Sequence, residues 1–416
     1  MERMQLIMLL RVFILIVSLL LVEYYFLNRL KHSLLKYFSL NEKQKKRILM
    51  LFVVILNLYP LYYIINLLHL VLFPASEVEF PDTWTIDFLF RLPGWFLIVW
   101  IVQTTIIALP VEIIVYGFLK LKNFSRAKFQ NYSYKLFSIV AVFFLIYIPL
   151  RIYYDSKNVI VEKRIYEIND AKRELDGLRI VFISDIQMDR FTHEARVKNY
   201  INKVNELKPD LVLISGDFIT GKDRYIHKVA NLVGRINFNL GVYSCVGDHD
   251  FFVYKKDYWR SLDTMKNVLK RHNVNMIDNG NVTFQINEAR IKVTFLTNTY
   301  VKSTNTNVLD SLAKNNDRYN LKILVSHQPD EIIANKASQL NYNLYLAGHT
   351  HGGQVRLIFP FINLTPVMLE TSFLAGDFKF GHTHMIVNRG LGYSTIPFRY
   401  NVTPEISLIV IKNKEE

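Results

Sequence analysis

The chain has 416 residues, of which 51% are hydrophobic, and it carries a formal net charge of +14. That length is too great for one ordinary domain, and the single cysteine, Cys245, excludes an intramolecular disulfide. The Lys and Arg residues of the first half lie in short runs between apolar segments. This pattern is typical of membrane topology signals, so we expect no nucleic-acid partner.

Four apolar segments lie in the first 152 residues, and each approaches or exceeds the roughly 20 residues that a membrane-spanning helix needs. The first of them could be a signal peptide, but no small-residue cleavage site follows it and three further segments do. The sequence therefore predicts an all-α transmembrane domain over residues 1–152, with spans at 4–27, 48–73, 92–119 and 134–152.

The loops between these segments differ in charge. The first and third loops are basic, whereas the second, residues 74–84, has no Lys or Arg and carries Glu77, Glu79 and Asp82. Because short basic loops stay on the cytoplasmic side, the pattern predicts a multi-pass protein of the inner or cell membrane. The remainder of the chain would then be a domain outside the cytoplasm. The basic residues are Arg29, Lys31, Lys36, Lys43, Lys45, Lys46 and Arg47 in the first loop and Lys120, Lys122, Arg126 and Lys128 in the third.

Two charged residues, Arg11 and Glu112, fall inside the apolar segments. Charges inside a membrane are candidates for function, but near the end of a span they more often snorkel to the surface. We expect snorkelling, and no pairing between these two, because they lie toward opposite faces of the membrane.

Residues 153–416 have the pattern of an α/β domain. Short β-rich runs at 178–184, 211–215, 242–246, 291–297, 322–326 and 343–347 alternate with helical patterns at 194–207, 223–236 and 258–271.

Five of these predicted strands end in residues that bind metal ions. The strand ends carry Asp185 and Gln187, then Asp217, then Asp248 and His249, then His327, and finally His349 and His351. The carboxyl ends of strands in such sheets are where ligands usually bind. Any one of these residues could be a helix cap or a surface histidine, but five in succession predict a cation site with several ligands.

The order of these residues resembles the pattern of the calcineurin-like metallophosphoesterase superfamily. That pattern is Asp-x-His, Gly-Asp, Gly-Asn-His-Asp/Glu, a later His, and Gly-His-x-His. The segments LDGLRIVFISD (175–185) and AGHTHGGQV (347–355) are similar to a bacterial branch of membrane-attached predicted phosphohydrolases. The resemblance covers about residues 162–411 and implies a metal-dependent phosphoric ester hydrolase whose β-sandwich is flanked by helices.

The resemblance also implies a binuclear metal centre. One ion would be bound by Asp185, Gln187, Asp217 and His351, and the other by Asp217, Asp248, His327 and His349. Asp217 would bridge the two ions, and a water between them would become the attacking hydroxide. His249 would be the catalytic residue that stabilises charge at the phosphate or protonates the leaving group.

Two positions depart from the family pattern. Gln187 stands where a His is usual, and Asp248 stands where an Asn is usual. Both changes shift the ligand set toward oxygen, so we expect Mn²⁺ to be favoured, with Mg²⁺, Fe or Zn²⁺ as the other possible ions. A branch that acts on ADP-ribose-like diphosphates also resembles this chain in having Gln there, so the change is compatible with activity.

A second Gly-His-Thr-His string occurs at residues 381–384. It lacks a preceding apolar strand and a following Gly-Gly-Gln, so we expect His382 and His384 to lie on a strand or loop outside the metal site.

Three functions compete. The leading hypothesis is a membrane-anchored phosphomonoesterase or phosphodiesterase that acts on a lipid head group or another envelope phosphate. The first alternative is a pyrophosphatase that cleaves a UDP-linked acyl sugar in lipid A synthesis, a cytoplasmic substrate that the predicted topology disfavours. The second is an inactive metal-binding scaffold, which the changes at Gln187 and Asp248 would explain.

Overall fold

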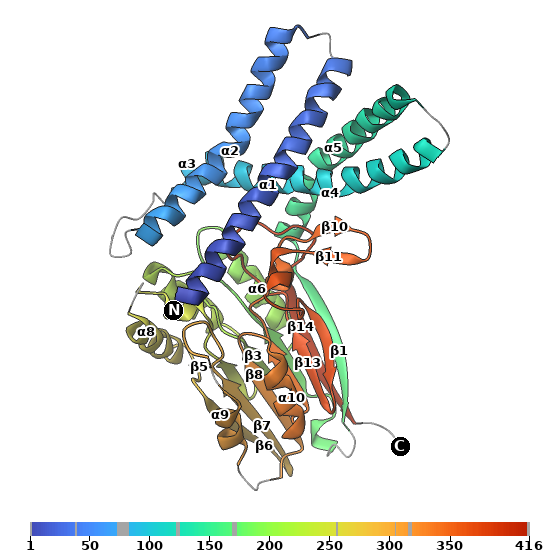
Figure 1. Ribbon diagram of the computed structural model, residues 1–416. Helices are drawn as coiled ribbons and strands as arrows, with labels where there is room; N and C mark the ends of the chain where they lie inside the picture. Colours follow the sequence, from blue (N-terminus) through green and yellow to red (C-terminus); the bar gives the residue numbers. More distant parts are fainter. Residues whose placement is uncertain are drawn as a thin grey trace. The chain divides into compact units, whose positions relative to one another are not determined.

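The computed structural model describes residues 2–37, 40–72, 83–121, 125–168, 173–254, 257–303, 305–314 and 318–413. The chain forms two compact units (Figure 1). The helical unit comprises Met1–Tyr153 together with the segment Leu357–Leu364, and the sheet unit comprises Tyr154–Arg356 and Thr365–Glu416. One short segment of the C-terminal half is therefore part of the N-terminal unit.

The helical unit is built from long helices and one β-hairpin. Its π-helix, η1, continues directly into the long helix α4. The hairpin strands β10 and β11 pair in antiparallel register, with Ile358 opposite Asn363. The elements are α1 (Glu2–Tyr37), α2 (Glu42–Leu72), α3 (Trp84–Ile86), η1 (Asp87–Arg91), α4 (Leu92–Leu121), α5 (Arg126–Lys157), β10 (Leu357–Phe359) and β11 (Ile362–Leu364).

The predicted membrane spans are confirmed in part. All four lie along long helices, except that residue 73 of the second lies outside the described residues. Two helical stretches among the residues described are long and apolar enough to cross a membrane. These are Trp84–Leu121 and Ala127–Lys157, each of which contains an 18-residue window with a mean hydropathy of 2.1. Length and composition therefore support two spans, and the other two remain a prediction.

The two charges predicted inside the membrane have different outcomes. Glu112 does not snorkel, because it is only 3% exposed and its Oε2 lies 2.7 Å from the Arg29 guanidinium. The sequence had placed Arg29 in a loop, but α1 continues to Tyr37 and makes Arg29 helical. The side chain of Arg11 and most of the acidic loop 74–84 lie outside the described residues.

The sheet unit contains two six-stranded sheets. The first has the order β1-β14-β2-β3-β4-β5, and its strands from β2 to β5 are parallel. The second has the order β12-β13-β9-β8-β7-β6, with β13, β9, β8 and β7 parallel. The strands are β1 (Ile160–Ile168), β2 (Arg179–Ile183), β3 (Leu211–Ile214), β4 (Gly241–Ser244), β5 (Val274–Met276), β6 (Gly280–Ile286), β7 (Ala289–Leu296), β8 (Leu321–Ser326), β9 (Leu344–Ala347), β12 (Gly376–Phe380), β13 (Thr383–Val387) and β14 (Glu405–Asn413).

Hydrophobic residues fill the space between the two sheets. The fully buried side chains of Phe182 and Leu213 from the first sheet belong to one cluster with Val293 and Ile323 from the second. Parallel strands covered on both faces need nearly continuous apolar sequences. The runs that predicted β2, β3, β8 and β9 have this composition, which is why the sequence located these strands to within two residues.

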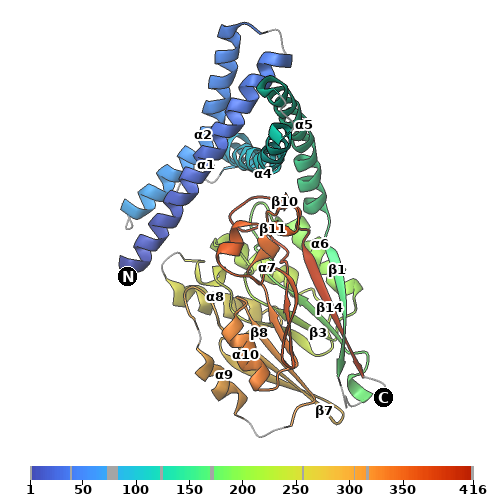
Figure 2. The ribbon, with the colours of Figure 1, turned by 45° about the vertical axis from the view of Figure 1, so that its right-hand side comes forward.

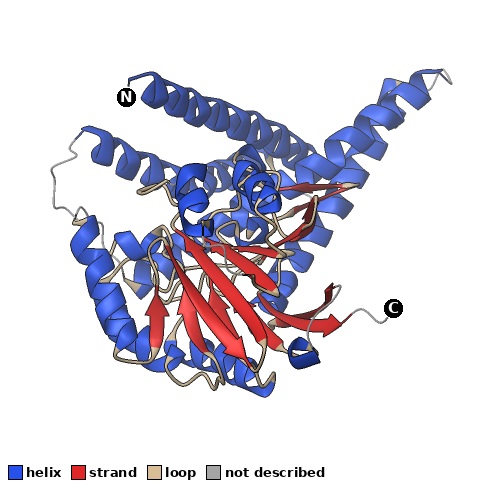
Figure 3. Cartoon of the chain, turned by 90° about the horizontal axis from the view of Figure 1, so that it is seen from below, coloured by secondary structure: helices blue, strands red, loops and turns tan. Residues whose placement is uncertain are grey.

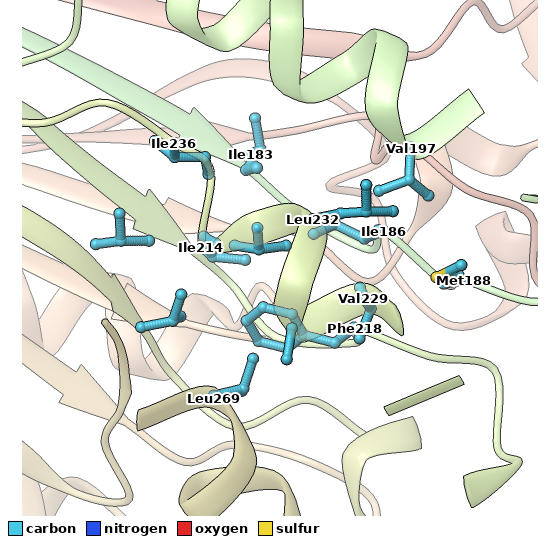
Figure 4. Packing of buried hydrophobic residues seen from close by; sticks show 14 of the residues in the cluster. Ile183, Ile186, Met188, Val197, Ile214, Phe218, Val229, Leu232, Ile236 and Leu269 are labelled. Atoms are coloured by element: carbon cyan, nitrogen blue, oxygen red, sulfur yellow. The ribbon is translucent and has the colours of Figure 1, made fainter. Parts of the chain in front are cut away.

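Helices cover the outer faces of both sheets, so the unit has four layers (Figures 2 and 3). Figure 4 shows the cluster beneath the first group of helices, where Ile183 and Ile214 of the sheet pack with Val197, Val229 and Leu269. The first group is α6 (Glu194–Glu206), α7 (Ile226–Val233) and α8 (Tyr258–Lys270), and the second is α9 (Thr306–Ala313) and α10 (Glu331–Gln339). This is the β-sandwich flanked by helices that the resemblance implied.

The core between the sheets should carry much of the stability of this unit. We expect Phe182→Ala to lower the free energy of unfolding by about 3–5 kcal/mol, because it leaves a cavity between the sheets. Phe238→Ala is the matched control, since Phe238 is 40% exposed and should cost far less. Chemical denaturation of the detergent-solubilised protein measures both, and equal losses would contradict this account of the core.

Candidate metal centre

The predicted ligands lie directly after strands of both sheets. Asp185 and Gln187 follow β2, Asp217 follows β3, and Asp248 follows β4 in the first sheet; His327 follows β8, and His349 and His351 follow β9 in the second. The short helices η4 (His249–Phe251) and η5 (His351–Gly353) begin within these ligand segments.

Five of the seven candidate ligands have backbone angles that L-residues rarely adopt. The φ angles of Asp185, Gln187, Asp217, His349 and His351 lie between +48° and +69°. This left-handed region is unfavourable for residues other than glycine, and such strain concentrates at functional sites. We infer that the surrounding structure holds these backbones in place so that their side chains converge.

The first ligand group consists of Asp248, His327 and His349. Asp248 Oδ2 lies 3.1 Å from His327 Nε2 and 3.0 Å from His349 Nδ1, and these two nitrogens are 3.3 Å apart. Ligands about 2.1 Å from one ion lie about 3.0 Å apart at right angles and about 3.4 Å apart in a tetrahedron. The three atoms therefore have the spacing of ligands around one cation.

The second group consists of Asp185, Asp217 and His327. His327 is therefore a member of both groups. His351 Nε2 is 3.6 Å from Asp185 Oδ1, and the Gln187 amide donates to Asp217 Oδ2 at 2.8 Å. Two oxygens here, Asp185 Oδ1 and Gln187 Oε1, are buried without a hydrogen-bond partner. Since such oxygens normally have a partner, their isolation fits a cation at this position.

Hydrogen bonds leave the ring nitrogens that face the site free to bind a cation. His327 Nδ1 donates to the Ser215 carbonyl oxygen at 2.6 Å, so its Nε2 is the lone-pair nitrogen of the neutral ring. His349 Nε2 lies 2.9 Å from Glu370 Oε1, a contact in which the nitrogen must donate. Its Nδ1, which points to Asp248, is then the ligand atom.

His249 lies beside the bridging position. Its backbone N–H donates to Asp217 Oδ1 at 2.7 Å, and its Nδ1 donates to the Thr220 carbonyl oxygen at 2.6 Å. The second bond fixes the orientation of the imidazole ring and leaves Nε2 free to exchange a proton.

Asp250 is a site residue that the sequence analysis did not assign. It is fully buried and accepts backbone N–H bonds from Gly247, Asp217 and Phe218 at 2.9, 3.0 and 3.1 Å. These bonds join the loops after β3 and β4 and so position Asp217. The Gly247–Asp250 motif contained this residue, so the sequence carried a signal for it.

Three further residues next to the ligands had no recognisable signal in the sequence. The Glu370 carboxylate and the Tyr300 hydroxyl both contact His349 Nε2. The Tyr300 backbone N–H donates to Asp248 Oδ1 at 2.7 Å. Arg399 is fully buried and donates to the His351 carbonyl oxygen at 3.2 Å. They come from loops far from the motifs, so only the fold brings them to the site.

The electrostatics of the site follow from buried charges of both signs. Burial raises the pKa of Asp217, and the carboxylates of Asp185 and Asp248 add to this effect. Burial would also raise the pKa of Asp248, but hydrogen bonds from His327 and His349 outweigh it and hold that pKa far below its usual value. A cation bound here would have to displace the protons carried by these groups.

The second Gly-His-Thr-His string lies apart from these groups, as predicted. His384 is on β13, paired in register with Leu344, and His382 lies in the turn before it. Neither belongs to a candidate metal group among the residues described.

Comparison with known proteins connects this geometry to a family. The sequence profile of the calcineurin-like phosphoesterases matches residues 178–353. A Bacillus subtilis protein described as the uncharacterized metallophosphoesterase YkuE is 33% identical over 242 residues, which cover 57% of this chain and 80% of that protein.

Two other relatives match over a smaller share of their own length. A Danio rerio protein named transmembrane protein with metallophosphoesterase domain is 25% identical over 59% of this chain and 55% of its own length. The UDP-2,3-diacylglucosamine pyrophosphatase LpxG of Chlamydia muridarum is 35% identical, but over only 99 residues, which cover 23% of this chain and 30% of that protein. This chain therefore spans about half of the zebrafish protein and less than a third of the chlamydial one.

Metal binding should stabilise the protein more at higher pH. Burial lowers the pKa of His349, but hydrogen bonds to Asp248 and Glu370 outweigh it and raise the pKa to about 9. The protonated ring therefore stabilises the metal-free protein at low pH, and this stabilisation is lost as the pH rises through about 9. Because a cation must displace that proton, we expect Mn²⁺ to raise the Tm more at about pH 8.5 than at about pH 6.5.

Thermal unfolding of the full-length protein in EDTA and in Mn²⁺ at both pH values measures this difference. Glu370→Gln removes one of the bonds that raise the His349 pKa, so it should reduce the pH dependence. A Tm increment that is the same at both pH values would contradict the assignment of His349.

The Asp250 carboxylate should be essential to the loops that carry the ligands. Asp250→Ala leaves three buried N–H groups without an acceptor, and we expect a loss of about 3 kcal/mol or more in the free energy of unfolding. Asp257→Ala is the control, because Asp257 only caps the start of α8 and should cost about 1 kcal/mol. Equal losses in denaturant titrations would refute this role.

Proposed function

This chain belongs to the calcineurin-like phosphoesterase family, whose members are metal-dependent phosphoric ester hydrolases, and we propose that it hydrolyses a phosphate mono- or diester at the centre described above. The observation that carries the proposal is the convergence of two ligand groups on His327, with Asp217 3.4 Å from its Nε2. Two adjoining cation positions are the arrangement that two-metal phosphoester hydrolysis requires.

In this proposal Asp185, Gln187, Asp217 and His351 hold one divalent ion, and Asp217, Asp248, His327 and His349 hold the other. When bound, the two ions supply Lewis acidity toward the phosphate and an activated water for in-line attack. The unpartnered oxygens of Asp185 and Gln187 support the first position, and the ligand spacing around Asp248 supports the second.

His249 is proposed as the proton donor to the leaving group. Its Nδ1 is committed to the Thr220 carbonyl oxygen, so only Nε2 can give a proton to a departing alkoxide. The backbone bond from the His249 N–H to Asp217 Oδ1 holds this residue beside the proposed bridging carboxylate, which supports the role.

The two unusual ligands support a preference for Mn²⁺. Gln187 offers an amide oxygen where an imidazole is usual, and Asp248 offers a carboxylate where an amide is usual. Mn²⁺ and Mg²⁺ prefer oxygen ligands, whereas Zn²⁺ prefers nitrogen and sulfur ligands. A ligand set with more oxygen atoms therefore favours Mn²⁺ or Mg²⁺ over Zn²⁺. Mg²⁺, Fe and Zn²⁺ are the other ions to test.

We further propose that the helical unit anchors this hydrolase in the membrane by four spans and that the sheet unit faces away from the cytoplasm. Two helices with the length and hydropathy of spans and the zebrafish relative named a transmembrane protein support the membrane location. The substrate proposed is a lipid head group or another envelope phosphate, because a tethered domain meets bilayer-bound substrates at high effective concentration.

Neither alternative from the sequence is favoured. The LpxG match covers only 23% of this chain, which does not support cleavage of a UDP-linked acyl sugar. The changes at Gln187 and Asp248 motivate the inactive scaffold, but the unpartnered Gln187 Oε1 and the contact of Asp248 Oδ2 with His327 Nε2 support metal binding by both residues.

Hydrolysis should depend on the bridging carboxylate. We expect Asp217→Ala to lower the Mn²⁺-dependent hydrolysis of bis-p-nitrophenyl phosphate on the order of 1000-fold, the equivalent of several kcal/mol of transition-state stabilisation. Asp310→Ala removes an aspartate of α9 that pairs with Lys336, and it should leave the rate unchanged. A wild-type protein without activity in any of the four metals would overturn the proposed function.

Restoring the usual family residues should change the metal preference. Two dications and the three carboxylates of Asp185, Asp217 and Asp248 sum to +1, and Asp248→Asn raises this sum to +2. Combined with Gln187→His, the change should shift the preference from Mn²⁺ toward Zn²⁺ and move the acid limb of the pH–rate profile to lower pH, because a more positive site lowers the pKa of bound water. An unchanged metal ranking and acid limb would show that these two residues are not ligands.

A further inference from the structure

The hairpin of β10 and β11 has a composition that is unusual for a surface segment. Its eight residues, LIFPFINL, include no charged residue and only one polar residue, Asn363. Phe361 is fully exposed, and Ile362 and Ile358 are 46% and 37% exposed. Water does not favour such a surface, so the hairpin requires an apolar partner.

The turn of this hairpin bears a strained aromatic residue. Phe361 has a φ of +66°, in the region that favours glycine, and it follows Pro360 at the tip between the two strands. A glycine would adopt this angle without strain. The chain thus places a large apolar side chain at the most exposed point of the hairpin despite a backbone cost, which points to a role for that side chain.

The hairpin packs on α4, the most apolar helix of the chain. Gln103 is fully buried in the middle of α4, and its amide makes two bonds to one residue of the hairpin. Its Nε2 donates to the Ile358 carbonyl oxygen at 2.9 Å, and its Oε1 accepts from the Ile358 N–H at 2.7 Å. Gln103 thereby satisfies the N–H and C=O of Ile358, on the edge of β10 that pairs with no strand among the described residues.

We propose that this hairpin is embedded in the lipid bilayer beside α4, with Phe361 inserted among the acyl chains. The inference rests on the membrane location proposed for the helical unit. Inside a bilayer an open strand edge is tolerated only where protein groups satisfy its hydrogen bonds, and the paired bonds to Gln103 meet this requirement at Ile358. The absence of charge and the exposed Phe361 match a lipid surface better than a polar protein partner.

The embedded hairpin has a consequence for the substrate. The chain enters β10 six residues after the ligand His351, and six residues span at most about 20 Å even when fully extended. A hairpin held in lipid therefore keeps the ligand segment within that distance of the bilayer. This favours phosphate esters that are themselves anchored in the membrane over soluble ones.

Lipid-borne quenchers test the location directly in full-length protein reconstituted into phosphatidylcholine–phosphatidylglycerol vesicles. A polarity-sensitive fluorophore is attached at Phe361→Cys, and vesicles carry nitroxide groups on the acyl chains. Ile114→Cys, on the exposed side of α4, is the membrane control, and Ile332→Cys, on α10 of the sheet unit, is the aqueous control. Cys245 is fully buried, so the unsubstituted chain reports any background labelling.

We expect the probes at 361 and 114 to be quenched at least threefold more than the probe at 332. Quenching at 114 without quenching at 361 would overturn the hairpin inference and leave the membrane location intact. A probe at 361 that is shielded from both nitroxide lipids and aqueous iodide would show a protein partner and would also overturn it. No quenching at 114 would refute the membrane location and the inference together.

Gln103→Leu supplies a second test, because it removes both bonds to Ile358 while keeping α4 apolar. We expect quenching at 361 to fall at least twofold. Thr104→Val is the matched control, since the Thr104 hydroxyl is buried without a hydrogen-bond partner, and it should leave quenching unchanged. Hydrolysis of soluble bis-p-nitrophenyl phosphate should persist in both variants, so that a failure of this inference is distinct from a failure of the proposed function.

Discussion

The concentration of buried charge at one rim of the sheet unit is the constraint on which the rest of the structure depends. Asp185, Asp217 and Asp248 are buried within a few ångströms of the imidazoles of His327 and His349. Buried carboxylates are costly unless cations or hydrogen-bond donors compensate them. Several hydrogen bonds keep this arrangement in place. Asp250 binds backbone N–H groups, carbonyl oxygens orient His327 and His249, and the buried Arg399 donates to the His351 carbonyl oxygen.

The same constraint explains why the site needs two sheets. A single parallel sheet presents its strand ends along one line, whereas the candidate ligands here surround a small volume from two sides. The first sheet supplies the carboxylates and Gln187, and the second supplies the three histidines. The apolar layer between the sheets, which includes Phe182 and Val293, therefore sets the distance between carboxylate and imidazole. Stability and chemistry depend on the same packing.

The segment Leu357–Leu364 belongs to a different unit from the residues on either side of it in the sequence. It belongs by contacts to the helical unit, although it lies between the ligand segment after β9 and the strands β12 and β13. Gln103 holds it by two hydrogen bonds to the backbone of Ile358. These bonds fix the backbone of the hairpin and not its side chains. Phe361 therefore stays available for the proposed contact with lipid.

The sequence by itself predicted the α/β class, the six principal strands and the seven candidate ligands, but not Asp250, Glu370, Tyr300 or Arg399. Continuous apolar runs such as 211–214 are typical of strands that are buried on both faces, so these strands could be located from the sequence. The candidate ligands could be located because each directly follows such a run. Only the tertiary structure decided which atoms meet. The pairing of Glu112 with Arg29, the contact of Glu370 with His349 and the docking of the hairpin on Gln103 join residues 83, 21 and 255 positions apart. Local patterns carry no record of such partners, because these contacts depend on how whole elements pack.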